Sequence, residues 1–129
     1  MLAEYRSDDQ YCLALMKEKF SKIFARAESR VGELRVELVG DRPCMGDVDI
    51  DAQESLASLC SDVITRVAGI TPTRRPGSTD CNIPLSLGIP AVSIGVYYGG
   101  GAHTMEEYLK RDSLTLGLEI SLSVVEKLL

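Results

Sequence analysis

The only histidine of the chain follows a run of three glycines. Residues 97–107 read Tyr-Tyr-Gly-Gly-Gly-Ala-His-Thr-Met-Glu-Glu, and an apolar segment that suits a buried strand runs into them. Loops at the carboxyl ends of sheet strands are where α/β proteins usually bind ligands. A neutral imidazole is a common metal ligand, and Glu106 or Glu107 lies close enough in sequence to orient or balance it. This stretch therefore makes His103 a candidate metal ligand.

The same residues have a purely structural interpretation. His103 can be a surface residue in a turn, with Thr104 and Glu107 forming a capping box. One histidine with scattered acids does not complete the three or four ligands of a zinc site, and the chain has no HExxH motif. Neither phosphate-binding glycine motif is present, so nucleotide binding is not indicated.

A second polar loop precedes the strand. Residues 77–82 read Gly-Ser-Thr-Asp-Cys-Asn. A glycine here lets the backbone approach a ligand closely. The alternative is that Ser78, Thr79 and Asp80 only cap a short helix that follows. On the local pattern alone, both interpretations stay open.

Taken together, residues 70–129 resemble the C-terminal segment of the di-zinc exopeptidase and deacylase family, which includes carboxypeptidase G, peptidase T, acetylornithine deacetylase and succinyl-diaminopimelate desuccinylase. The resemblance rests on the two loops just described and on Gly-Ile-Pro-Ala-Val at residues 88–92, in the family's order and spacing. Residues 2–39 are similar, in a looser match, to the later half of that family's lid or dimerisation domain, where a strand ending in Arg6-Ser7 leads into a helix and another strand.

The resemblance implies a metal-activated water that attacks an amide carbonyl, held by two zinc ions or by other divalent metals such as cobalt or manganese. His103 matches the family's final metal ligand. Thr79, Asp80 and Asn82 match a loop that shapes the substrate pocket. The last implied substrate-binding residues are Gly100 and Gly101, which would leave room for substrate and present backbone groups to it.

The remaining family ligands are absent from these 129 residues. The family's HxD motif, its catalytic Glu-Glu pair and its other metal-binding acid have no counterpart here, so no catalytic residue is assigned in this chain. We expect this chain to be the C-terminal fragment of a zinc-dependent peptidase or N-acyl-amino-acid deacylase. The chain alone should be inactive, and the parent enzyme should be a homodimer. The alternative is a non-catalytic binding or oligomerisation module that kept this fold.

Periodicity supplies the elements that must position these loops. Apolar residues at helical spacing predict helices over 8–29 and from Asp51 to a stop at Gly69, and a brief helix over 82–87. Strands are predicted over 33–39 and 90–95. The segment 113–129 suits either pattern, and its length favours a helix.

The predicted fold class is α/β, with helices packed on a sheet. Residues 46–129 would be the C-terminal part of a zinc-exopeptidase catalytic domain, and residues 1–45 a β-α-β remnant of its lid domain. The short mixed stretch at residues 2–6 reads as the end of a strand whose beginning is missing, which is why a fragment is expected.

Composition excludes several partner classes. The formal charge is −5 with no basic stripe, so nucleic acid is not an expected partner. No apolar run approaches the ~20 residues of a membrane span, and the start of the chain lacks a signal peptide, so a cytoplasmic location is expected. The pattern leaves open which amide is cleaved, and whether Arg74 or Arg75 holds a substrate carboxylate.

Overall fold

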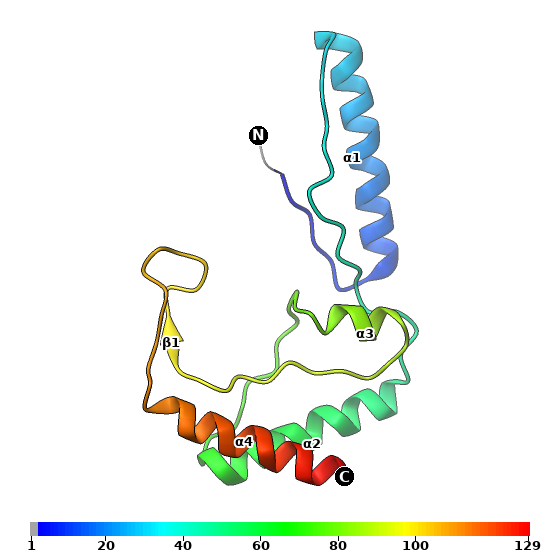
Figure 1. The fold of residues 1–129 in the computed structure, drawn as a ribbon. Coiled ribbons are helices and arrows are strands. Elements are labelled where there is room, and N and C mark those ends of the chain that lie inside the picture. Colours follow the sequence, from blue (N-terminus) through cyan, green and yellow to red (C-terminus); the bar gives the residue numbers. More distant parts are fainter. Residues whose placement is uncertain (1–2) are drawn as a thin grey trace. The chain divides into compact units, whose positions relative to one another are not determined.

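The computed structural model describes residues 3–129, which divide into two compact units (Figure 1). One unit contains the chain up to Asp49 together with Pro76–Pro90, and the other contains Ile50–Arg75 and Ala91–Leu129. Helices account for 49% of the described residues, and the strands among these residues form one two-stranded antiparallel sheet. The predicted α/β class holds in this coarse, helix-dominated form, and the predicted division at residue 45 stays a prediction.

Helix α1, Gln10–Val31, dominates the first unit and confirms the helix predicted over 8–29. Its N-cap is Asp9, whose carboxylate accepts the Cys12 amide at 2.7 Å. The Ser7 hydroxyl accepts the Asp9 amide just before the helix. The helix ends at Gly32, where φ is 85° and the amide bonds to the carbonyl of Glu28. Local capping chemistry thus sets both ends.

Two extended stretches of the first unit, around Tyr5 and over residues 33–41, run beside α1 (Figure 1). The Tyr5 ring stacks on Phe20 with centroids 4.8 Å apart, and Lys17 pairs with Asp41 at 2.7 Å. These contacts fix the stretches on the helix, but none of the residues of α1 is fully buried. The apolar face of α1 is therefore only partly covered.

The strand predicted over 33–39 is wrong as a hydrogen-bonded element. Among residues 3–129 it has no ladder partner, and the same holds for residues 3–6; Leu2 lies outside the described residues. Val36, Leu38 and Val39 are exposed. Alternating hydrophobicity marks one face of a strand, but a strand forms only when a neighbour takes its backbone hydrogen bonds. Of the predicted β-α-β remnant, the structure shows the helix.

Helix α3, Asn82–Ser86, confirms the brief helix and ends before Gly88, where φ is 78°. The connector of residues 43–48 packs around it. Its Gly46 amide donates to the Leu85 carbonyl at 3.0 Å, and Cys44 and Val48 are buried. A Cβ at Gly46 would lie 2.7 Å from the Ser86 carbonyl oxygen, so this close approach requires glycine.

The second unit is built on helix α2, Ile50–Ala68, packed against helix α4, Ser113–Leu128. Both confirm predicted helices, and Gly69 (φ 69°) follows α2 as predicted. Cys60, Val63 and Val124 form the centre of its core. No helix in residues 3–129 is long and apolar enough to cross a membrane.

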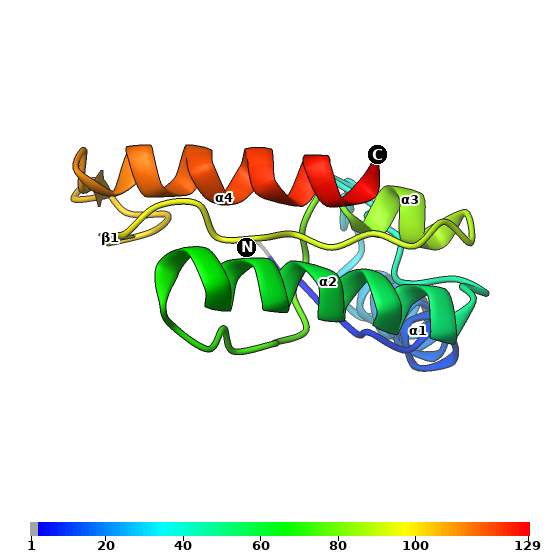
Figure 2. The ribbon, with the colours of Figure 1, turned by 90° about the horizontal axis from the view of Figure 1, so that it is seen from below.

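An extended segment, residues 91–96, lies across one side of the α2–α4 pair (Figures 1 and 2). Val92 and Ile94 pack against the core of the two helices. Gln53 fixes its start, because the side-chain amide donates to the Ala91 carbonyl at 3.0 Å and accepts the Ala91 amide at 2.9 Å. The segment is extended, but the buried strand predicted over 90–95 is wrong as a sheet element because no described segment pairs with it.

Gly117 allows this docking, because a Cβ there would overlap the carbonyl group of Val96. We expect Gly117→Ala to destabilise the protein by about 1–3 kcal/mol through overpacking, although alanine favours a helix. Gly95→Ala is the matched control: it lies in the docked segment with open space around its Cβ, and its effect should stay within about 0.5 kcal/mol. Urea unfolding followed by circular dichroism measures both; equal midpoints would contradict this packing.

The N-cap of α1 predicts a local pH dependence. Hydrogen bonds from Cys12, chiefly from its backbone amide, hold the pKa of Asp9 below its usual 3.8. The cap is therefore intact above that value and is lost as the pH falls through the lowered pKa. The Cys12 amide proton shift should titrate with a midpoint below 3.8, in the wild type and in Asp8→Asn. In Asp9→Asn the transition should vanish; its persistence would mean that another group caps the helix.

Candidate functional site

The histidine lies in a hairpin of the second unit. Strand β1, Gly99–Gly100, pairs antiparallel with β2, Tyr108–Leu109, and the Lys110 amide continues the pairing to the Tyr98 carbonyl at 2.7 Å. The base is anchored by Ser113 at the start of α4, whose buried hydroxyl accepts the Tyr98 amide at 2.9 Å and donates to the Lys110 carbonyl at 2.6 Å. The loop that follows β1 in Figure 1 is thus joined firmly to the start of α4.

Thr104 organises the loop of residues 101–107. Its amide and its hydroxyl both donate to the Gly101 carbonyl, at 3.0 and 2.7 Å. The hydroxyl also accepts the Glu106 amide at 3.2 Å, and the Thr104 carbonyl accepts the Glu107 amide at 3.3 Å. Short polar side chains commonly close turns in this way. The loop is a compact turn, and the predicted capping box is wrong because no helix begins here.

His103 sits at the tip of this turn with φ at 65°, the one non-glycine residue of the described chain with a positive φ. The left-handed conformation costs an L-residue about 1–2 kcal/mol. Its amide donates to a carboxylate oxygen of Glu107 at 3.2 Å, and the residue is exposed. Backbone strain of this kind gathers at functional sites. Glu107 therefore acts on the backbone of His103.

The glycines before His103 meet demands of the hairpin itself. A Cβ at Gly100 would lie 2.9 Å from the Tyr108 ring. A Cβ at Gly101, where φ is 66°, would lie 2.8 Å from the Glu106 carbonyl oxygen. Close packing within the loop accounts for both residues, and their contact with substrate stays a prediction.

The second polar loop belongs to the first unit. The Asn82 side-chain amide donates to the Pro43 carbonyl at 2.8 Å, and its oxygen accepts the Thr79 amide at 3.0 Å. The Thr79 hydroxyl accepts the Cys81 amide at 3.3 Å, just before α3. Both polar groups of Asn82 are therefore engaged by the backbone, which favours a structural role for this side chain.

Asp80 has few internal partners. Its side chain is fully exposed, and Arg42 approaches it at 3.5 Å. Exposed ion pairs of this kind contribute about 0–1 kcal/mol. The carboxylate of Asp80 is thus accessible to a ligand.

The predicted site residues divide between the two units. Thr79, Asp80 and Asn82 come together in the first, and Gly100, Gly101 and His103 in the second. Among residues 3–129, no three His, Cys, Asp or Glu side chains are placed to hold a metal ion. The donor set therefore fits one ligand of a zinc site, and a complete site needs ligands from outside these residues.

Arg74 has a structural role that the sequence left open. Its guanidinium donates to Glu54 at 2.7 Å, to the Ser58 hydroxyl at 3.1 Å and to the Ser61 hydroxyl at 3.3 Å. These contacts hold residues 70–75 along α2. A substrate carboxylate would have to compete with them, so Arg75 is the better candidate of the pair.

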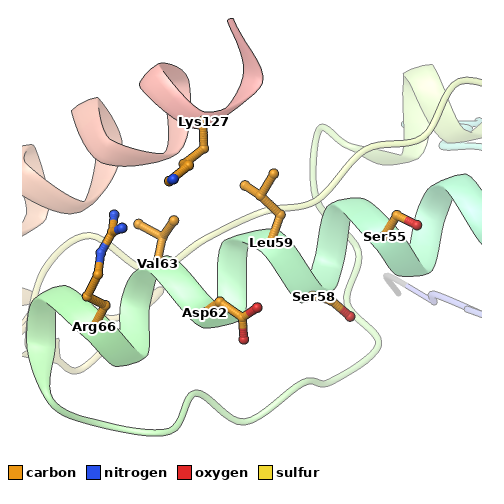
Figure 3. A pocket seen from close by; sticks show the side chains of 7 residues that line it. All are labelled: Ser55, Ser58, Leu59, Asp62, Val63, Arg66 and Lys127. Atoms are coloured by element: carbon orange, nitrogen blue, oxygen red, sulfur yellow. The ribbon is translucent and has the colours of Figure 1, made fainter.

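A groove between α2 and the end of α4 was missed by sequence reasoning (Figure 3). Leu59 and Val63 form its apolar floor, and Arg66 and Lys127 reach into it from the two helices. The two cations lie far apart in sequence with no shared motif. Helix packing alone brings them together, so no sequence signal could have identified the groove.

Comparison with protein-family models, with curated proteins and with solved structures finds no match to this chain.

Asn82 should be essential to its loop. Asn82→Ala would leave the Pro43 carbonyl and the Thr79 amide unpaired, and we expect destabilisation of about 1–3 kcal/mol. Asp80→Asn, which alters only an exposed pair, should stay within about 0.5 kcal/mol. Amide hydrogen exchange at Thr79 and urea unfolding measure the local and the global effect. If the Thr79 amide exchanges at the same rate in Asn82→Ala, the Asn82 side chain does not hold this loop in place.

Proposed function

We propose that this chain is the C-terminal part of a metal-dependent peptidase or N-acyl-amino-acid deacylase, with His103 as one of its metal ligands. The observation that carries the proposal is the presentation of His103: it is exposed at the tip of a compact loop, in a left-handed backbone conformation, with its amide bonded to Glu107. A metal site needs ligands held in a fixed direction on a rigid support. The hairpin, anchored to α4 through Ser113, supplies such a support.

The segment before the hairpin supports an α/β catalytic domain as the setting. Residues 91–96 are extended, lie on two helices and have no strand beside them in the described chain. Their backbone groups are suited to pairing with neighbouring strands, and helices covering one face of such a sheet are the usual α/β arrangement. His103 then follows the carboxyl end of a sheet strand, where these folds place ligands.

Exposed apolar side chains on α4 support a larger assembly. Leu114, Leu118, Leu122 and Val125 are 46%, 60%, 55% and 52% exposed. They recur at helical spacing, and a helix that is apolar on more than one face is normally covered on each. In the proposal, the rest of the enzyme covers this stripe, and the exposed segment at residues 33–39 offers an edge for a homodimer.

In this proposal the metal, when bound, would activate the water that attacks an amide carbonyl. The chain's own contribution is to hold one imidazole, with the loop glycines beside it in the same hairpin. Because the described residues bring one histidine and no complete ligand group, the chain alone should not hydrolyse amides.

A non-catalytic binding or oligomerisation module is the second candidate. The observation favouring it is that Asn82, expected in the substrate pocket, and Arg74, whose role the sequence left open, are both engaged in structural hydrogen bonds. Such a module would use the same exposed segments for assembly, and His103 would then be dispensable for any activity.

An amide-hydrolysis assay on the longer protein separates the two candidates. His103→Ala should lower kcat/KM by more than about a hundredfold, because loss of a ligand exceeds the effect of disturbing its outer-shell partners. Glu106→Ala is the matched control. Glu106 is exposed and bonds to Thr104 through its backbone amide, so kcat/KM of this variant should stay near the wild-type value. A fully active His103→Ala variant would contradict the assignment.

A further inference from the structure

The backbone of His103 needs a partner to stay where it is. A φ of 65° is disfavoured for a residue with a Cβ, and an unrestrained loop would relax toward negative φ. The Thr104 turn restrains the residues after His103, through bonds to the Gly101 carbonyl and to the Glu106 amide. These bonds leave the His103 amide itself to another acceptor.

Glu107 supplies that acceptor. Its Oε2 lies 3.2 Å from the His103 nitrogen and accepts its N–H, bridging the tip of the loop from four residues further on. The carboxylate is positioned because β2 begins at the next residue and pairs with β1. The hairpin therefore determines where Glu107 lies, and Glu107 in turn determines the conformation of the His103 backbone.

We propose that Glu107 is the positioning residue of His103, acting through the backbone amide and not as a metal ligand or as a charge beside the imidazole. The inference rests on the proposed function, in which His103 binds the metal. It predicts that the hydrogen bond matters and that the negative charge does not. A glutamine, which keeps an acceptor oxygen at the same reach, should then replace Glu107, whereas alanine should not.

Nuclear magnetic resonance on the 129-residue chain tests this directly. The readouts are hydrogen exchange of the His103 amide, the backbone coupling that reports its φ, and the side-chain couplings that report its χ1. In the wild type and in Glu107→Gln we expect a protected amide, a positive φ and one dominant rotamer. In Glu107→Ala, exchange should accelerate by about tenfold, the equivalent of one net hydrogen bond, and the rotamers should average.

Two controls separate positioning from loss of structure. The Thr104 amide, bonded to the Gly101 carbonyl, should keep its exchange rate in Glu107→Ala, because the turn does not use the carboxylate. Glu106→Ala should match the wild type at every readout. Collapse of the loop would instead accelerate Thr104 and His103 together, and that result would overturn a specific positioning role.

Two further outcomes would also overturn the proposal. One is an unprotected His103 amide in the wild type. The other is a Glu107→Gln variant that behaves like Glu107→Ala, because the charge would then be the property that matters. The proposed hydrolase function fails by a different result, an active His103→Ala enzyme, so the two failures are distinguishable.

Discussion

The structure of the second unit depends on one close approach, that of residues 91–96 to helices α2 and α4. Gly117 lets the backbone of α4 reach the Val96 carbonyl, while Gln53 holds the other end of the segment with two hydrogen bonds. The hairpin follows directly and is tied to the start of α4 through Ser113. The position of His103 is therefore set by packing that lies well outside its own loop.

The helices were predictable because their determinants are local. Apolar spacing over 10–31, 50–68 and 113–128 selects one face of each helix, and a cap or a glycine marks both ends of α1 and the end of α2. The sheet was not predictable in the same way. Residues 33–39 alternate as an exposed strand does and residues 90–95 suit a buried strand, but pairing is a property of two segments, and the described chain provides no partner for either. The pattern identifies a strand-like surface and does not show what covers it.

For the candidate site, residue type was predictable from the sequence, whereas the contacts of each side chain were not. Sequence reasoning selected His103 and Asn82 by their chemistry and their place after glycines. It did not foresee that Asn82 would bond to the backbone at Pro43, or that Arg74 would be engaged along α2, because these contacts join residues 39 and 13 to 20 positions apart. The left-handed backbone of His103 was also unforeseen, since histidine is only enriched at positive φ and most residues of its type adopt negative φ.

Hydrogen exchange at the backbone amides of residues 92–96 in the isolated, monomeric chain tests the central claim most directly. If this segment is a sheet strand whose neighbours lie outside residues 3–129, its amides should exchange close to the rate of an unstructured peptide, while amides within α2 and α4 stay protected. Protection of residues 92–96 as strong as that of the two helices would contradict the account, because their hydrogen bonds would already be satisfied within this chain.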